Sequence, residues 1–398
     1  MRIIYDVSLK VLRAILAKTS SDVLRNELNK DEQLRFLSSL DDVGADLVKR
    51  SINQYQCQKK IIGLKNIILL NIGSFAVLLV AVPIFVLNYL FRYKKYDYVN
   101  EAGKKAVYFG TDLVLIPKIL QDEFSIVICN KSLMLNFQDF KFILFNLFNT
   151  IYSPYFVLKC IIKIAFYRAN IFEFTPKAMI VNSEYSFTSS LLTKYCTFND
   201  ILHINLMHGE KLFNMIDSFS YFHRFYIWDE YYKGLFTRLK SDAGQFIVAL
   251  PEVFVFDASK TGKDDIKSNF LTYYLIGEDK DRLFTIKSIL DKLAYKYRIY
   301  IRPHPRCSDL DVVNKIFCDF NVEDINNVSI LDSIEKAGFA VSTYSTVLFQ
   351  AYLYGKTVII DDLSYKDTCT KLKDLEYHML DKSHLLLSDL LNKVIEKS

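Results

Sequence analysis

The sequence has 398 residues, of which 51% are hydrophobic but only 12 are Gly and 7 are Pro. This composition excludes collagen-like, linker-like and low-complexity disordered chains, and the length predicts two or three domains with packed cores. A net charge of +5 is too small for a dedicated nucleic-acid-binding protein, and seven scattered Cys residues without a C-x-x-C pair indicate reduced thiols rather than disulfides or a zinc site.

Residues 1–100 are predicted to form a helical, membrane-associated region. Apolar residues recur at helical spacing in 7–16, and 67–91 then carries no charged residue. A helix of that length could cross a bilayer. Pro83 and basic residues on both flanks leave three structures open: a spanning helix, an interfacial segment or hairpin that turns near Pro83, and a buried core helix.

A second apolar region covers 137–167 and is predicted to form two amphipathic helices with a break at Ser153-Pro154. Lys159, Lys163 and Arg168 lie among its apolar residues, which is typical of helices that lie in a membrane interface. The same pattern also fits two core helices.

Short apolar segments alternate with helical segments along the rest of the chain, which predicts parallel sheets with crossover helices. The predicted strands are 105–112, 124–129, 178–181, 201–206, 225–228, 246–250, 270–276, 297–301, 339–341 and 357–360, and the predicted helices are 186–195, 230–239, 281–296, 329–336 and 346–354. The polar stretch 257–268 is the best domain boundary. We therefore expect an α/β chain with Rossmann-like domains at 101–255 and 256–398 that face each other across a cleft.

The strongest chemical motif is Arg302-Pro303-His304-Pro305-Arg306, directly after a predicted strand. Two prolines fix the backbone at the carboxyl end of a parallel strand, where α/β sheets bind ligands. An imidazole between two guanidinium groups suits a phosphate. The alternative is a rigid turn with a surface histidine.

A second motif, Ser342-Thr343-Tyr344-Ser345-Thr346, lies between a predicted strand and a predicted helix. Hydroxyl and backbone N–H groups at a helix N-terminus bind phosphates, although an ordinary N-cap also explains one hydroxyl. Ser342, Thr343, Ser345 and Thr346, together with Gly277 after the strand 270–276, are assigned to nucleotide binding.

Candidates for a general base follow the strands of the first α/β domain. Gly209 allows a sharp exit from the strand 201–206, so that His208 and Glu210 are expected at the cleft. Asp229 closes the next strand and is a weaker candidate, because acids are common at helix N-termini. Asp279-Lys280-Asp281 has the D-x-D spacing of some metal-dependent enzymes but opens a predicted helix, and no phosphate-loop or dinucleotide motif is present. No metal and no cofactor are therefore expected.

From Pro176 to Asp361 these motifs resemble the bacterial sialyltransferases of GT-B architecture that are encoded in O-antigen and capsule clusters. The resemblance rests on His304-Pro305, on the Ser-Thr pairs about forty residues later, and on the stretches 207–213 and 225–230. It implies that His304 and the Ser and Thr hydroxyls contact the single phosphate of a CMP-sugar. The acidic [DE]-[DE]-G triplet of those enzymes is absent, so Glu210, His208 and Asp229 remain candidates for the base.

The expected function is transfer of sialic acid or a related nonulosonic acid from a CMP-sugar to a lipid-linked oligosaccharide, at the cytoplasmic face of the bacterial inner membrane. A cationic His304 with neighbouring Arg residues would stabilise the leaving phosphate without a metal. CDP-glycerol glycerophosphotransferases and Kdo transferases share the layout and remain alternatives. A membrane scaffold with degenerate, non-catalytic α/β domains is a further one.

Overall fold

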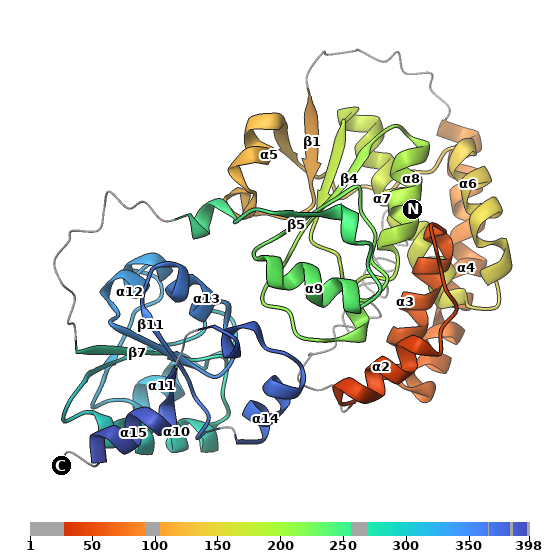
Figure 1. Ribbon diagram of the computed structural model, residues 1–398. Coiled ribbons are helices and arrows are strands. Elements are labelled where there is room, and N and C mark those ends of the chain that lie inside the picture. The colour runs from red at the N-terminus through yellow and green to blue at the C-terminus, as the bar shows by residue number, and fades with distance from the viewer. Residues whose placement is uncertain (1–27, 93–103, 256–268, 365, 383–384, 396–398) are drawn as a thin grey trace. The chain divides into compact units, whose positions relative to one another are not determined.

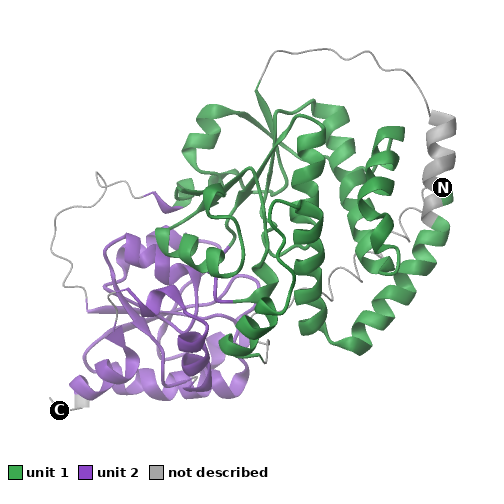
Figure 2. Cartoon of the chain, turned by 45° about the vertical axis from the view of Figure 1, so that its right-hand side comes forward, with its two compact units in different colours: residues 1–208, 214–253 green, residues 209–213, 254–398 purple. Residues whose placement is uncertain are grey.

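The computed structural model describes residues 28–92, 104–255, 269–364, 366–382 and 385–395. The predicted helix at 7–16 and the predicted boundary at 257–268 lie outside the described residues. Two compact units are present, coloured separately in Figure 2: residues 1–208 with 214–253, and residues 209–213 with 254–398.

The first unit is built on a parallel six-stranded sheet in the order β2-β1-β3-β4-β5-β6 (Figure 1). Its strands are short and mostly buried, as expected for a sheet with helices on both faces. They are β1 (Lys105–Tyr108), β2 (Ser125–Ile128), β3 (Ala178–Val181), β4 (Leu202–Leu206), β5 (Arg224–Ile227) and β6 (Phe246–Val248). The order reverses between β1 and β3, and ligands bind at such switch points in open α/β sheets.

The long helix α7 (Pro154–Phe174) leads directly into β3. Pro154 occupies its first turn, where a missing N–H costs nothing, and Thr175 ends it in the left-handed conformation. The buried Arg168 of this helix donates to Asp139, which the hydroxyl of Tyr195 also reaches at 2.6 Å. This network joins α7 to α6 (Phe137–Leu147) and α8 (Ser189–Phe198).

The helices that precede the sheet are α2 (Lys30–Ser38), α3 (Leu47–Ile62) and α4 (Leu64–Arg92), and they belong to the first unit. Buried amides of α3 bind backbone carbonyls of the sheet loops: Gln54 donates to Glu184 and Gln58 to Tyr185. The smaller elements of this unit are α5 (Lys118–Glu123), α9 (Glu230–Arg238), η2 (Leu113–Leu115), η3 (Phe148–Thr150), η4 (Met215–Asp217), η5 (Ala243–Gln245) and, at its border, η6 (Glu252–Phe254).

Helix α4 decides between the alternatives for the apolar segment 67–91. The helix continues through Pro83, so the hairpin that turns there is wrong. It packs against α7 and α3, but one face stays exposed, so a wholly buried helix is also wrong; the exposed apolar side chains are Leu64, Ile68, Leu69, Ile72, Phe75, Leu79 and Val80. Within the described parts of the chain, no helix combines the length and the apolarity needed to cross a membrane.

The second unit has its own parallel six-stranded sheet, in the order β12-β11-β10-β7-β8-β9. Its strands are β7 (Phe270–Tyr274), β8 (Arg298–Arg302), β9 (Asn321–Val322), β10 (Phe339–Ser342), β11 (Thr357–Ile360) and β12 (Leu385–Leu386). Here the order reverses between β7 and β10. The candidate ligand crevice of this unit therefore lies beyond the carboxyl ends of these two strands.

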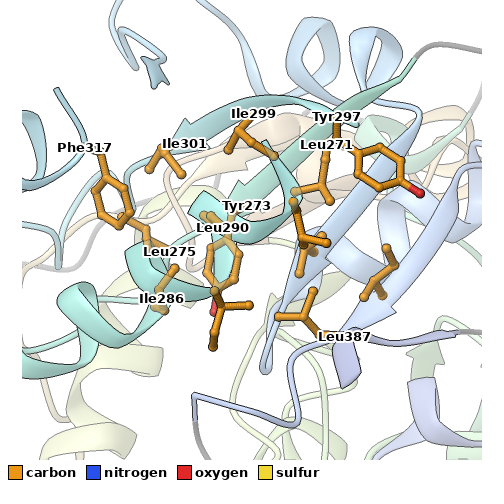
Figure 3. Packing of buried hydrophobic residues seen from close by; sticks show 14 of the residues in the cluster. Leu271, Tyr273, Leu275, Ile286, Leu290, Tyr297, Ile299, Ile301, Phe317 and Leu387 are labelled. Atoms are coloured by element: carbon orange, nitrogen blue, oxygen red, sulfur yellow. The ribbon is translucent and has the colours of Figure 1, made fainter. Parts of the chain in front are cut away.

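The core of the second unit lies between this sheet and helices that include α10 (Lys280–Leu293) and α15 (Leu387–Ile395). Figure 3 shows Tyr273 of β7 among Leu275, Ile286 and Leu290, all buried. Each such side chain contributes about 1.5–3 kcal/mol through burial. The remaining elements are α11 (Leu310–Ile316), α12 (Ile330–Lys336), α13 (Thr346–Leu353), α14 (Lys366–Asp374) and η7 (His378–Leu380).

A five-residue segment of the second unit comes from far earlier in the chain. Residues 209–213 follow β4 of the first unit but group with the second. Leu212 and Phe213 are buried, and the Phe213 N–H donates to the Leu375 carbonyl at 2.7 Å. Two α/β units are thus present, and the chain between β4 and β5 contributes to both.

Candidate functional site

The carboxyl edge of the second sheet holds most of the predicted nucleotide-binding residues. Loops after β7, β8 and β10 begin there, at Leu275, Pro303 and Thr343 respectively. Because β7 lies between β8 and β10 in the sheet, its loop is flanked by the other two.

His304 is held in one orientation by its own loop. Its Nδ1 accepts the backbone N–H groups of Arg306 at 3.1 Å and Cys307 at 3.2 Å. Its backbone N–H donates to the hydroxyl of Ser308. With Nδ1 used as an acceptor, the proton of the neutral ring is on Nε2, which can donate to an anion.

The surroundings of His304 affect its protonation. Burial, together with the nearby charge of Arg306, lowers its pKa below the ordinary value. Without a ligand the neutral imidazole is therefore favoured, and Nε2 could donate a hydrogen bond to a phosphate.

Gly277 allows the loop after β7 to approach the His304 loop closely. Its φ is +100°, in a region that favours glycine. A Cβ atom at this position would lie 2.5 Å from the Cβ of Cys307. Any other residue at this position would therefore force one of the two loops to move.

Glu278 occupies the backbone donors at the end of β7. Its carboxylate accepts the N–H groups of Ile276 and Gly277 at 3.0 Å each. Burial raises its pKa, and the nearby Asp361 adds to that increase. Asp361 follows β11 and accepts the hydroxyl of the buried Tyr273. Sequence reasoning missed Glu278, Asp361 and Tyr273, although Asp361 directly follows the predicted strand 357–360 and Glu278 comes two residues after the predicted strand 270–276.

The hydroxyls of the Ser-Thr motif have different surroundings. Ser342 is fully buried and donates to the carbonyl of Tyr274 at 2.8 Å, and Thr343 is 1% exposed. Ser345 is the N-cap of α13 and accepts the N–H of Val347. Ser345 and Thr346 are partly exposed, so these two hydroxyls are the ones that a ligand at the helix N-terminus can reach.

The two guanidinium groups that flank His304 also differ. Arg302 is 8% exposed; it donates to the carboxylate of Glu323 at 2.9 Å and to the Val328 carbonyl at 3.0 Å. It therefore ties the end of β8 to the segment after β9. Arg306 is exposed, as is Pro305, so Arg306 is the guanidinium that solvent reaches.

Glu210 lies near the N-terminus of α13 within the second unit. Its carbonyl accepts the hydroxyl of Tyr344 at 2.9 Å, and an added Cβ on Gly209 would lie 4.0 Å from the hydroxyl of Thr346. The Glu210 side chain is 7% exposed, and its charge contributes to a raised pKa of the buried Tyr377, for which burial is the main cause. One candidate base and the Ser-Thr motif are thus brought together.

His208 is the last residue of the first unit before this segment and is exposed at the carboxyl end of β4. The buried carboxylate of Glu184, which follows β3, accepts the His208 backbone N–H at 3.2 Å and the amide of Asn205 at 3.0 Å. Glu184 therefore fixes the backbone at His208. The sequence carries no signal for this role of Glu184 except its position after a strand.

The remaining acidic candidates cap helices. Asp229 is the N-cap of α9 and accepts the N–H of Tyr231 at 2.9 Å. Asp279 caps α10 by accepting the N–H of Arg282, and Asp281 lies in the first turn. Among the described residues, no group of three or more His, Cys, Asp or Glu could hold a metal ion.

No protein-family profile matches the sequence, and no curated protein matches it. Among solved structures, the wall teichoic acid polymerase TagF is 12% identical, with a TM-score of 0.46 over 82% of this chain and 90% of that one. The UDP-GlcNAc 2-epimerase from Neisseria meningitidis is 12% identical, with a TM-score of 0.42 over 74% of this chain and 99% of that one. S. aureus MnaA is 12% identical, with a TM-score of 0.44 over 71% of this chain and 91% of that one.

Proposed function

We propose that this protein is a GT-B glycosyltransferase that transfers sialic acid or a related nonulosonic acid from a CMP-sugar to a hydroxyl of a lipid-linked oligosaccharide. The reaction is proposed to need no metal and to take place at the cytoplasmic face of a bacterial inner membrane. The observation that carries the proposal is the geometry of His304, whose Nδ1 accepts two backbone N–H groups and whose Nε2 is therefore a fixed donor.

The donor phosphate is proposed to lie over the loop after β7. His304 would donate from Nε2 on the β8 side, and the N-terminus of α13 would supply the hydroxyls of Ser345 and Thr346 on the β10 side. Arg306 is the proposed cation. Ser342, Thr343 and Arg302 support the site from within, because their side chains are buried.

The general base is proposed to be Glu210 in a sialyltransferase. This residue is 7% exposed and lies beside the N-terminus of α13, where its carbonyl accepts the hydroxyl of Tyr344 at 2.9 Å. A carboxylate at this position is suited to accept the proton of an acceptor hydroxyl as a general base.

CMP binding and transfer test the proposal. The full chain should be stabilised in a thermal-shift assay by CMP more than by UDP or GDP, and His304→Ala should reduce transfer from CMP-sialic acid by about 10²-fold or more. Leu310→Ala, at an exposed residue that opens the helix after the His304 loop, is the matched control. No shift with any nucleotide would support the non-catalytic scaffold instead.

A second candidate is transfer of glycerol phosphate from CDP-glycerol. It is favoured by His208, which is exposed and has its backbone held by Glu184, whereas Glu210 is buried. An exposed imidazole is the better base for a substrate that approaches from solvent. Incubation of the original chain with CMP-sialic acid and with CDP-glycerol separates the two reactions, because only the true donor should be consumed. The same assay with His208→Ala and with Glu210→Gln identifies the base as the residue whose substitution lowers the rate more.

A further inference from the structure

Two lysines that the proposed donor site does not use lie one turn apart on α7. Lys159 and Lys163 are at i and i+4, so their side chains share one face of the helix. Phe109, the first residue after β1, packs against Phe166 and Tyr167 with ring centroids 5.0 and 4.8 Å apart. This contact marks the level of the carboxyl edge of the sheet along α7.

The helix carries both lysines beyond that edge. Because α7 leads back into β3 of a parallel sheet, it runs opposite to the strands, and residues before Phe166 lie past their carboxyl ends. At 1.5 Å per residue, Lys163 lies about 5 Å and Lys159 about 11 Å beyond the level of Phe109. Both therefore border the region above the switch point between β1 and β3, where open α/β sheets bind ligands.

Neither lysine has a negative partner within the described part of the chain. The ammonium of Lys159 lies 4.2 Å from the ring centroid of Phe187 and forms no ion pair there, and Lys163 forms none either. Burial lowers the pKa of Lys159 to about 7, with the charge of Lys163 adding to the effect, and burial lowers the pKa of Lys163 as well. An anion between them would compensate two partly buried charges.

A third lysine, Lys59 of α3, lies near the aromatic side chain that Lys159 contacts. The ammonium of Lys59 lies 5.2 Å from the ring centroid of Tyr55, and Tyr55 packs on Phe187 with centroids 4.9 Å apart. Helix α4, with its exposed apolar face, reaches the same end of α7, because Asn71 accepts the N–H of Tyr155 at 3.1 Å. A cationic surface and an exposed apolar surface therefore meet at one end of the first unit.

We propose that Lys159 and Lys163 form an anion-binding subsite of the first unit that holds the phosphate or diphosphate group of a lipid-linked acceptor. The identity of the ligand as a lipid-linked acceptor rests on the proposed function, whereas the binding of an anion does not. The donor motifs belong to the second unit, and the lysine pair belongs to the first, next to the helix that would contact the lipid.

Calorimetric titration of the full chain with inorganic pyrophosphate tests the subsite. The His304→Ala background removes the proposed donor phosphate site, so that pyrophosphate reports on the first unit. In that background we expect Lys159→Gln with Lys163→Gln to weaken pyrophosphate binding at least tenfold, and Lys159→Arg with Lys163→Arg to retain it. The control Lys141→Gln removes an exposed lysine on α6 that also lies over a ring, that of Phe137 at 4.8 Å, and should change nothing.

Equal pyrophosphate binding with and without the lysine pair would overturn the proposal. CMP binding by the double Gln variant, measured with His304 intact, should equal that of the original chain, which shows that the variant is folded. If the original chain fails to bind CMP, the proposed function fails, while the pyrophosphate result still stands by itself.

A vesicle assay separates the two sources of phosphate. Vesicles of phosphatidylglycerol and phosphatidylcholine should bind the double Gln variant as well as the original chain, because the two lysines are partly buried on α7. Loss of vesicle binding with unchanged pyrophosphate binding would assign the pair to membrane headgroups and overturn the acceptor subsite.

Discussion

Gly277 is constrained both by its backbone conformation and by the space around it. Its backbone conformation requires glycine, and the space for a side chain is already filled by Cys307 of the next loop. The loop that carries His304 is thus positioned partly by a residue with no side chain. Such a contact joins the loops after β7 and β8 and keeps the His304 ring above the strand ends.

Gly277→Ala should lower the free energy of unfolding of the second unit by about 2–4 kcal/mol, because left-handed strain and overpacking add. Gly355→Ala is the matched control: its φ is +67° but no atom lies within 4 Å of an added Cβ. We expect it to cost only the strain, about 1–2 kcal/mol. Chemical denaturation of both variants measures the difference, and equal losses would mean that the contact with Cys307 is unimportant.

Lys159 should make stability depend on pH. With a folded-state pKa of about 7 and an ordinary unfolded pKa near 10.5, the unfolded chain binds one more proton between these values. The free energy of unfolding should therefore rise from pH 7 to pH 10, by at most about 1.4 kcal/mol per pH unit. Below pH 7 the lysine is protonated in both states, so it should add no further pH dependence.

Lys159→Met should stabilise the protein at pH 7 and remove that part of the pH dependence. Lys141→Met, at an exposed lysine, should keep the profile of the original chain. Denaturation midpoints at four pH values from 7 to 10 provide the comparison. Parallel curves for the original chain and Lys159→Met would contradict a buried, low-pKa lysine.

At the scale of elements, sequence patterns predicted strands and helices well where burial is two-sided. The apolar segments 178–181 and 357–360 are β3 and β11 with the predicted bounds. The two-residue strands β9 and β12 were missed, because they are too short for any periodic signal. Strand order was also beyond the sequence, since it depends on packing between segments that are far apart in the chain.

The same limit explains the candidate site. Proximity to strand ends predicted His304 and the Ser-Thr motif, which lie at the carboxyl edge. It did not distinguish Ser342, which bonds to a carbonyl, from Ser345, which caps a helix, because both have the same local sequence context. In the sequence, Lys159 and Lys163 fit the polar face of an amphipathic helix, and only the position of α7 against the sheet supports the proposed anion site.

Helix α4 is proposed to contact the membrane through its exposed apolar face, with the exposed Lys60 and Lys65 near its N-terminal end. Leu69→Asp, Ile72→Asp and Leu79→Asp combined should reduce co-sedimentation with anionic vesicles at least tenfold, by about 1–2 kcal/mol for each side chain. Phe284→Asp on α10, equally exposed in the second unit, is the control. Undiminished co-sedimentation of the triple variant would exclude this face as the contact.

At the scale of the whole molecule, the chain does not divide into two consecutive pieces. Residues 209–213 interrupt the first unit and complete the second. The predicted domains 101–255 and 256–398 are continuous in sequence and do not assign residues 209–213 to the second unit. A segment of five residues is too short to show a distinct composition. Because residues 209–213 belong to the second unit, Glu210 and the N-terminus of α13 lie in one unit.

Phe213→Ala tests this arrangement. Phe213 is fully buried and lies between β4 and β5 in sequence, yet it packs in the second unit. Removing its ring should cost about 3–5 kcal/mol and should lower hydrogen-exchange protection in β10 and β11 more than in β1 and β3. Phe225→Ala, at a buried residue of β5, should have the opposite distribution. If Phe213→Ala reduced protection mainly in the first sheet, the segment 209–213 would belong with the strands that flank it, and Glu210 would no longer be fixed relative to the Ser-Thr motif.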